Sequence, residues 1–100
     1  YDRFGEVVEK LFWYNISFDK LTGMGTYVMK FLPGAKSVHH IHGGYEEFLV
    51  LDGTLIDNDG YVYNNGDFAT LTPGSSHYSY SETGCKVLVF MRGINRIVKS

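Results

Sequence analysis

The most informative stretch of the chain is residues 34–53, which read Gly34-Ala-Lys-Ser-Val-His-His-Ile-His-Gly-Gly-Tyr-Glu-Glu-Phe-Leu-Val-Leu-Asp-Gly53. It contains three of the four histidines, and the fourth closes the later segment Thr72-Pro-Gly-Ser-Ser-His77. His40 and His42 are two residues apart, so on an extended strand both imidazoles project from the same face. The stretch therefore predicts a strand that presents two imidazoles together.

A carboxylate, that of Glu46, follows His42 by four residues. Gly43-Gly44 predicts a turn, and the apolar run from Phe48 to Leu51 predicts a returning strand with Glu46 at its start. A second hairpin would bring His77 to the same space from the far side. Neutral imidazoles with one carboxylate are a nitrogen and oxygen ligand set suited to a divalent first-row metal. We therefore predict a metal site formed by His40, His42, Glu46 and His77.

The individual signals are weak and their combination is stronger. A single histidine or glutamate on a strand is usually exposed or hydrogen-bonded to a neighbour, and a lone His-x-His often has no role. His39 and Glu47 are adjacent in sequence to predicted ligands, so strand alternation places them on the opposite face. Three histidines and one glutamate would leave metal positions open for water, oxygen or substrate, as a catalytic site requires and a closed structural zinc site does not.

The pattern resembles that of a known family. The positions of Gly34, His40, His42, Glu46 and Gly53 resemble the first cupin motif, and residues 66–77 resemble the second. Within the cupins, residues 39–53, Pro-Gly-Ser-Ser-His and Glu-Thr-Gly-Cys85 are most similar to the cupin domain of ChrR-type anti-sigma factors and to related small stand-alone proteins. Thr72 departs from the proline usual in the second motif. The resemblance implies the same four ligands, a divalent metal (iron, zinc, manganese or nickel) and no further cofactor.

Length and composition predict a single all-β domain. One hundred residues suit one core, and short aromatic and β-branched runs between turn residues predict a closed barrel or two-sheet jelly roll. With the resemblance, we expect a cupin β-barrel (double-stranded β-helix) over residues 1–100, with an arm at 1–20, a core at 21–93 and a tail at 94–100. The predicted strands include residues 11–18, 26–32, 54–56, 61–63, 68–71, 77–80 and 86–91, the last of them central.

Three further features of the sequence concern two turns and the inward face of one strand. Asn64-Asn-Gly66 predicts a hairpin turn, and residues 57–60 predict a tight turn rather than a calcium loop. In the strand at 26–32, either the odd-numbered or the even-numbered residues line the barrel, and the pattern does not distinguish them.

Charge and cysteine usage exclude several partners. The net charge is −2 and the basic residues are scattered, which argues against nucleic acid, and no apolar run has membrane-spanning length. Cys85 is the only cysteine, which favours a reducing compartment, and we expect a cytoplasmic protein. The apolar first twenty residues predict a homodimer, through Phe4, Val7, Val8, Leu11, Phe12 and Trp13.

The resemblance implies two functions. One is a mononuclear non-haem metal dioxygenase or related oxidoreductase acting on a small organic molecule such as a diketone. The alternative is a ChrR-like metal-dependent sensor or binding module without turnover, for which a helical segment before Tyr1 would be needed. A third interpretation is a structural barrel with an incidental metal. Tyr45, Tyr78 and Tyr80 are expected to pack on the barrel rather than to react, and Cys85 to be a buried apolar group.

Overall fold

In the described part of the chain, every regular element is a β-strand. The computed structural model describes residues 10–37, 40–41, 43–72, 74, 76–93 and 96–97, with the backbone alone for 40–41, 76–77 and 96–97. The strands are β1 (Leu11–Asn15), β2 (Met24–Phe31), β3 (Ala35–Lys36), β4 (His40–Ile41), β5 (Glu46–Gly53), β6 (Leu55–Asp57), β7 (Val62–Tyr63), β8 (Phe68–Leu71), β9 (Ser76–His77), β10 (Ser79–Ser81), β11 (Cys85–Arg92) and β12 (Arg96–Ile97).

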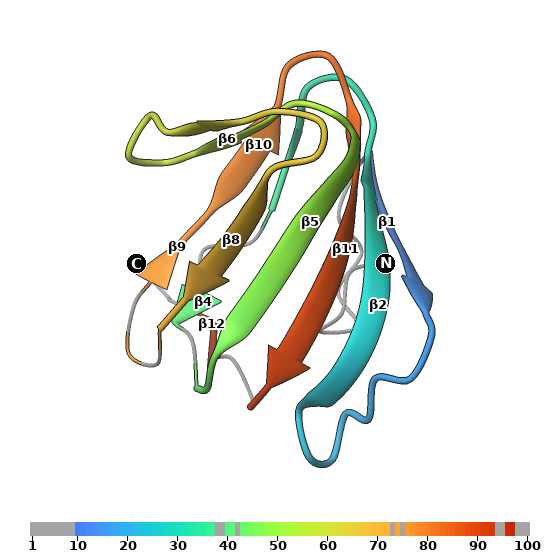
Figure 1. The fold of residues 1–100 in the computed structure, drawn as a ribbon, viewed down its shortest axis with the longest axis vertical. Helices are drawn as coiled ribbons and strands as arrows, with labels where there is room; N and C mark the ends of the chain where they lie inside the picture. The colour runs from blue at the N-terminus through green and yellow to red at the C-terminus, as the bar shows by residue number, and fades with distance from the viewer. Residues whose placement is uncertain are drawn as a thin grey trace.

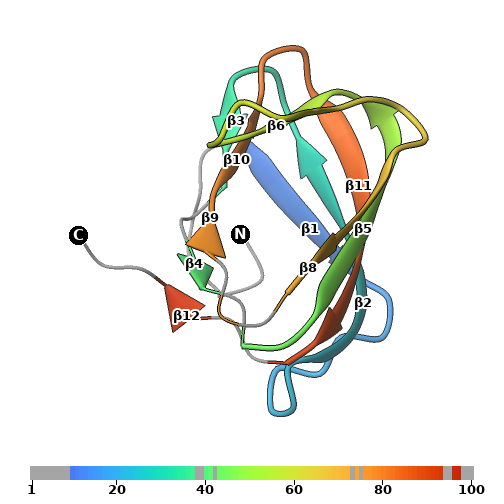
Figure 2. The same cartoon turned by 60° about the vertical axis from the view of Figure 1, so that its left-hand side comes forward.

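The strands form three antiparallel sheets that enclose one core. The five-stranded sheet has the order β1-β2-β11-β5-β8, the four-stranded sheet β3-β10-β6-β7 and the three-stranded sheet β12-β4-β9. The five-stranded sheet forms one wall, with β10, β9 and β4 on the other side of the interior (Figures 1 and 2). This arrangement confirms the predicted all-β jelly-roll fold. In the described residues, we find no helix long and apolar enough to span a membrane.

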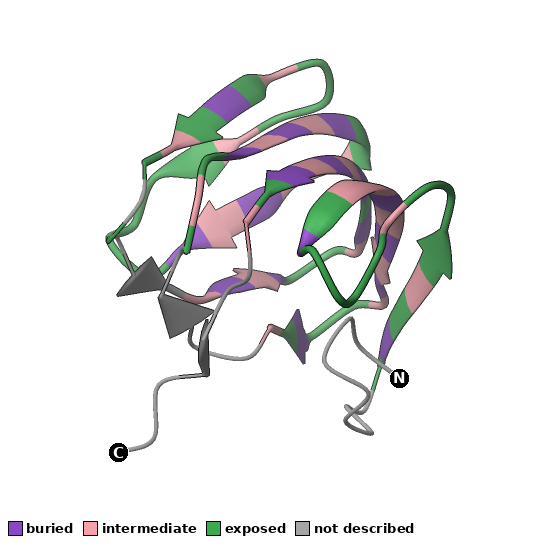
Figure 3. Cartoon of the chain, turned by 90° about the horizontal axis from the view of Figure 1, so that it is seen from below, coloured by how far each residue is buried: buried purple, intermediate pink, exposed green. Residues whose placement is uncertain are grey.

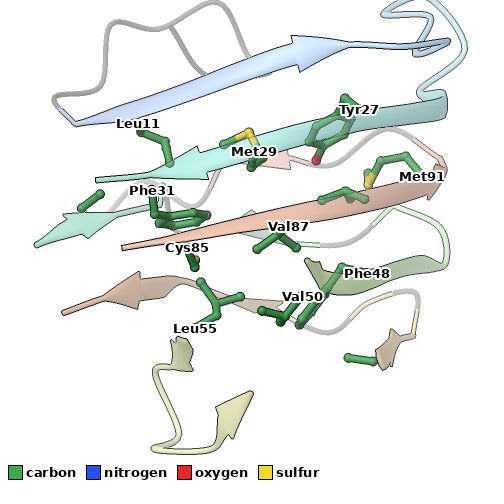
Figure 4. Packing of buried hydrophobic residues seen from close by; sticks show 13 residues of the cluster. Leu11, Tyr27, Met29, Phe31, Phe48, Val50, Leu55, Cys85, Val87 and Met91 are labelled. Carbon is green, nitrogen blue, oxygen red and sulfur yellow. The ribbon is translucent and has the colours of Figure 1, made fainter. Parts of the chain in front are cut away.

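Alternation along the long strands determines which residues form the core. In β2, the odd-numbered Tyr27, Met29 and Phe31 are buried and the even-numbered residues face outward, which resolves the choice that the sequence left open. Buried residues of β5 and β11 extend the same layer, and Figure 4 shows these side chains gathered between the strands. The strand β11 lies between β2 and β5, so the prediction of a central strand there is confirmed.

The Asn64–Gly66 turn is not the predicted hairpin. The strand before it, β7, pairs with β6, and the strand after it, β8, pairs with β5. The Gly66 N–H donates to the Val50 carbonyl (2.8 Å), and the Val50 N–H donates to the Asp67 carbonyl (3.0 Å). The turn is thus bonded to β5 and carries the chain from one sheet to another.

The Gly43-Gly44 turn also joins two sheets, so the expectation that the following strand returns along β4 is wrong. β4 pairs with β9 and β12, whereas β5 pairs with β8 and β11. The physical reason is a contact with the end of β11. The Arg92 N–H donates to the Tyr45 carbonyl (3.0 Å), and a Cβ added to Gly44 would overlap the Arg92 carbonyl.

Two predicted strands are shorter than expected. β1 ends at Asn15 rather than at residue 18, because the Asn15 side chain accepts the Phe18 N–H (2.7 Å) and donates to the Phe18 carbonyl (3.0 Å). The predicted strand at 77–80 is divided at Tyr78 into β9 and β10. Residues 57–60 form the expected tight turn, closed by the Gly60 N–H on the Asp57 carbonyl (2.8 Å). Residues 1–9 of the predicted arm and most of the predicted tail lie outside the described residues.

Candidate functional site

Glu46 is a buried carboxylate and the first residue of β5. It is 4% exposed and alternates with the buried Phe48 and Val50, so its side chain faces the barrel interior. Its neighbours across the sheet are Met91 on β11 and Leu71 on β8. The prediction that Glu46 begins the strand after the double-glycine turn is confirmed.

Glu47 lies on the opposite face of the same strand. Its Oε1 accepts a hydrogen bond from Arg92 Nη2 (2.7 Å), and its Oε2 accepts one from Thr70 Oγ1 (3.2 Å). The two carboxylates are adjacent in sequence and point into different environments, as strand alternation requires. The prediction that Glu47 faces away from the side occupied by Glu46 is confirmed.

Glu46 lines a small cavity inside the barrel. The cavity volume is about 40 Å³, which leaves room for a water molecule or a small functional group of a ligand. Its wall is mostly apolar, and its polar residues are Glu46 and Tyr27 on the five-stranded sheet and Ser37 and Ser79 on the opposite side. The apolar lining residues are Met29, Phe31, Phe48, Leu55, Val87 and Val89.

The wall opposite the five-stranded sheet contains a buried hydrogen-bond network. Ser79 Oγ donates to Asp57 Oδ1 (2.8 Å), and both residues are buried. The Ser79 N–H donates to Ser37 Oγ (2.8 Å), and the Ser37 N–H donates to the Ser79 carbonyl (2.7 Å). These hydrogen bonds hold Ser37 and Ser79 in fixed positions at the cavity wall. The charge of Asp57 also acts on Tyr63, whose pKa is raised to about 12, first by burial and then by this charge.

This network was not predicted from the sequence. Asp57 was assigned only to a turn, although it alternates with the buried Leu55 in β6 and therefore shares its inward face. Ser37 and Ser79 carry no signal of their own, because their role depends on a contact between residues 42 positions apart.

The predicted histidine ligands are placed only in part. His40 on β4 and His77 on β9 are register partners, and such pairs have Cα atoms about 4.5–5.5 Å apart. The side chains of these two residues, and all of His39 and His42, lie outside the described residues. Among the residues that the structure does describe, no group of three or more His, Cys, Asp or Glu is arranged to hold a metal. The four-ligand site therefore remains a prediction.

The chain connects this histidine pair directly to the cavity wall. Ser37 precedes His40 by three residues, and Ser79 follows His77 by two. Two residues thus separate Ser37 from His40 along the chain, and one residue, Tyr78, separates His77 from Ser79. The histidine pair therefore lies close along the chain to the pair of serines at the cavity wall.

The comparison with protein families identifies the fold family. The model of the ChrR cupin-like domain matches residues 3–95. The chain belongs to the ChrR cupin-like domain family. The predicted resemblance is therefore confirmed at the level of the family.

Solved structures share the fold of this cupin at low sequence identity. An RmlC-like cupin protein from Ralstonia eutropha superposes with a TM-score of 0.85 and 15% identity, covering 97% of this chain and 65% of its own. An acetylacetone dioxygenase from Acinetobacter johnsonii gives a TM-score of 0.81 and 14% identity, covering 90% and 64%. The polyketide cyclase RemF from Streptomyces resistomycificus gives 0.74 and 18%, covering 93% and 74%.

The cupin thus spans about two thirds of the length of the first two of these proteins. No curated protein matched the sequence. At these identities, the likeness to the solved structures establishes the fold.

The other candidate reactive groups of the cupin differ in their exposure. Cys85 is buried, and burial, the largest cause, raises its pKa from 9.0 to about 11. The ring of Tyr78 lies 4.1 Å from Lys36 Nζ, a cation–π contact, and Tyr45 is 47% exposed. The burial of Cys85 agrees with the prediction that this residue is a buried apolar group.

Proposed function

We propose that this cupin binds one divalent metal through His40, His42, Glu46 and His77 and oxidises a small organic molecule such as a diketone. The observation that carries the proposal is the burial of the Glu46 carboxylate at the wall of an interior cavity. The opposite wall continues along the chain into the register pair of His40 and His77. The fold likeness to an acetylacetone dioxygenase supports the choice of substrate class.

The chemical types of these residues fit a metal. The carboxylate of Glu46 is an oxygen ligand of the kind that divalent first-row metals accept. Imidazole adds neutral nitrogen donors near physiological pH. A divalent metal held by this set would supply Lewis-acid chemistry and, if it is iron, redox chemistry to a chelating substrate.

The cavity wall would select the ligand. Ser37 Oγ already accepts the Ser79 N–H, so its own proton can be donated to a ligand oxygen. Ser79 Oγ donates to Asp57, so it can accept a hydrogen bond from the ligand. One donor and one acceptor facing an apolar wall suit an enolised diketone, which carries both a carbonyl and a hydroxyl group. The apolar residues would exclude water from the bound group.

The two adjacent glutamates provide a matched test of metal binding. We expect Glu46→Gln to lower the affinity for iron(II) or manganese(II) at least tenfold, because the substitution removes the ligand charge at nearly constant volume. Glu47→Gln should leave that affinity unchanged, since Glu47 faces the outside and bonds Arg92 and Thr70. Titration of metal-free protein by calorimetry measures both. Equal affinities in the two variants would remove Glu46 from the site.

A sensor without turnover is the second candidate, and the ChrR family membership favours it. Oxygen uptake by iron-loaded protein with a panel of diketones distinguishes the two. The oxygenase consumes oxygen only when a substrate is present. A sensor shows no uptake, but its hydrodynamic radius or its binding of a partner depends on the metal or on an oxidant.

A further inference from the structure

The turn at residues 57–60 lies beside the backbone that joins His77 to the cavity wall. Tyr78 is the single residue between β9, which ends at His77, and β10. Directly beyond the register pairs of β10 with β6, Asn58 comes opposite Tyr78. A contact between these two residues therefore acts on the position next to a proposed metal ligand.

Asn58 binds both backbone polar groups of Tyr78. The Asn58 N–H donates to the Tyr78 carbonyl (3.0 Å), and the Tyr78 N–H donates to Asn58 Oδ1 (3.3 Å). In a regular antiparallel ladder, the second of these bonds would end on the carbonyl of the opposite residue. Because the chain turns at residues 57–60, the amide side chain takes the place of that carbonyl. Asn58 thus extends the pairing of β6 and β10 by one residue.

The turn is closed by its own hydrogen bonds, which fix the position of the Asn58 backbone. The Gly60 N–H donates to the Asp57 carbonyl (2.8 Å), and the Asp57 N–H donates to the Tyr61 carbonyl (2.9 Å). Asp59 Oδ1 accepts the Tyr61 N–H (2.9 Å). Asn58 and Asp59 are both exposed, and Figure 3 shows exposed turns between strands on which buried and exposed residues alternate. The turn therefore presents Asn58 Oδ1 from a fixed backbone.

Other contacts fix Tyr78 on its C-terminal side. Ser79 Oγ donates to Asp57 Oδ1 (2.8 Å), and Lys36 Nζ lies 4.1 Å from the centre of the Tyr78 ring. The bond to Asn58 Oδ1 acts on the N-terminal side, at the amide that follows His77. Loss of this one bond therefore affects the His77 side of Tyr78 first.

This amide belongs to the peptide group between His77 and Tyr78, so its orientation depends on the ψ angle of His77. A hydrogen bond at the amide restrains that angle and, through it, the position of the His77 backbone. The described ladder of β9 with β4 has only two register pairs, His77 with His40 and Ser76 with Ile41, so it supplies few restraints. Ligating groups have to be held within about 0.5 Å of their productive positions.

We propose that Asn58 is a positioning residue for His77 and acts through the Tyr78 N–H, which rests on the proposed role of His77 as a metal ligand. Asn58 is exposed, and the residues that line the cavity do not include it. Its effect on the site passes through the backbone and not through contact with the metal or the substrate.

Titration of the metal-free full chain with cobalt(II), followed by visible absorption, tests the proposal. We expect Asn58→Ala to lower the affinity about tenfold, as is usual when a group that orients a metal ligand is removed. Asn58→Asp retains the acceptor oxygen and should restore most of the affinity. Asp59→Ala is the matched control, because it removes the bond to the Tyr61 N–H in the same turn, and it should bind as the wild type does. Circular dichroism confirms that each variant is folded.

The His77→Ala background distinguishes positioning of His77 from a general loosening of the site. In that background, Asn58→Ala should change the affinity for cobalt(II) no further, because the positioned ligand is already absent. Hydrogen exchange of metal-free protein provides a second readout, in which the Tyr78 amide should exchange faster in Asn58→Ala than in the wild type or in Asp59→Ala.

Three results would overturn the proposal while the wild type still binds metal. They are an unchanged affinity in Asn58→Ala, an equal loss in Asp59→Ala, and an undiminished effect of Asn58→Ala in the His77→Ala background. A wild type that binds no metal would instead refute the proposed function, and the role of Asn58 with it.

Discussion

Glu46 and Glu47 show how strand alternation assigns different roles to identical neighbouring residues. Glu46 is 4% exposed inside the barrel, whereas Glu47 bonds Arg92 and Thr70 on the outer face. Cys85 on β11 shows that burial also lowers the reactivity of a nucleophile. A thiolate is the reactive form, and burial disfavours it.

We expect Cys85 to react slowly and to make the fold sensitive to alkali. Its pKa is raised from 9.0 to about 11, so the thiol is protonated in the folded protein at pH 8. Alkylation by iodoacetamide at pH 8 should be at least tenfold slower than in denaturant. Between pH 9 and 11 the unfolded chain loses this proton before the folded chain does, so stability falls as pH rises, by on the order of 2 kcal/mol.

The difference in urea stability between wild type and Cys85→Ala isolates this effect, because Tyr63, whose pKa is also raised, is present in both. The difference should shift in favour of Cys85→Ala across that pH range. A constant difference, or alkylation as fast in the folded as in the unfolded protein, would show that the thiol is accessible.

At the scale of elements, the turns determine how the sheets connect. Gly53, at the end of β5, has φ of +84°, and a Cβ there would lie 2.9 Å from the Cα of Cys85 and overlap the Gly84 carbonyl. Gly60 has a similar φ of +91° but open space around it. Alanine substitutions at Gly60 and Gly53 therefore distinguish the free-energy cost of the backbone conformation from that of a steric clash.

We expect Gly60→Ala to lower the free energy of unfolding by about 1–2 kcal/mol, the cost of a left-handed conformation for a residue with a Cβ. Gly53→Ala should cost at least about twice as much, because the neighbouring atoms are backbone and cannot move aside independently. Urea unfolding followed by fluorescence measures both. Equal costs would mean that β5 and β11 separate readily at this point.

The sequence located most of these elements but not all their partners. Alternation, turn residues and β-branched runs are local, and they predicted the long strands and the start of β5 at Glu46. Pairing is not local: the Asn64–Gly66 turn has a hairpin sequence, yet its flanking strands belong to different sheets. For the same reason, the Asp57, Ser79 and Ser37 network had no sequence signal, because it joins separate strands.

At the scale of the whole molecule, the barrel encloses the proposed site. The interior would hold the metal and a small ligand between Glu46 and the serine wall. The inward residues of β5 line this cavity, whereas its outward residue Glu47 forms an ion pair with Arg92 on the outer face of the five-stranded sheet.

Metal content of the purified protein tests the central claim most directly. Protein prepared without a chelating column from metal-supplemented medium is analysed for iron, manganese, nickel and zinc, together with His42→Ala and its neighbour control His39→Ala. We expect one divalent metal per chain in the wild type and nearly as much in His39→Ala, but almost none in His42→Ala. A wild type without stoichiometric metal, or equal loss in both variants, would contradict the assignment of His40, His42, Glu46 and His77 as ligands.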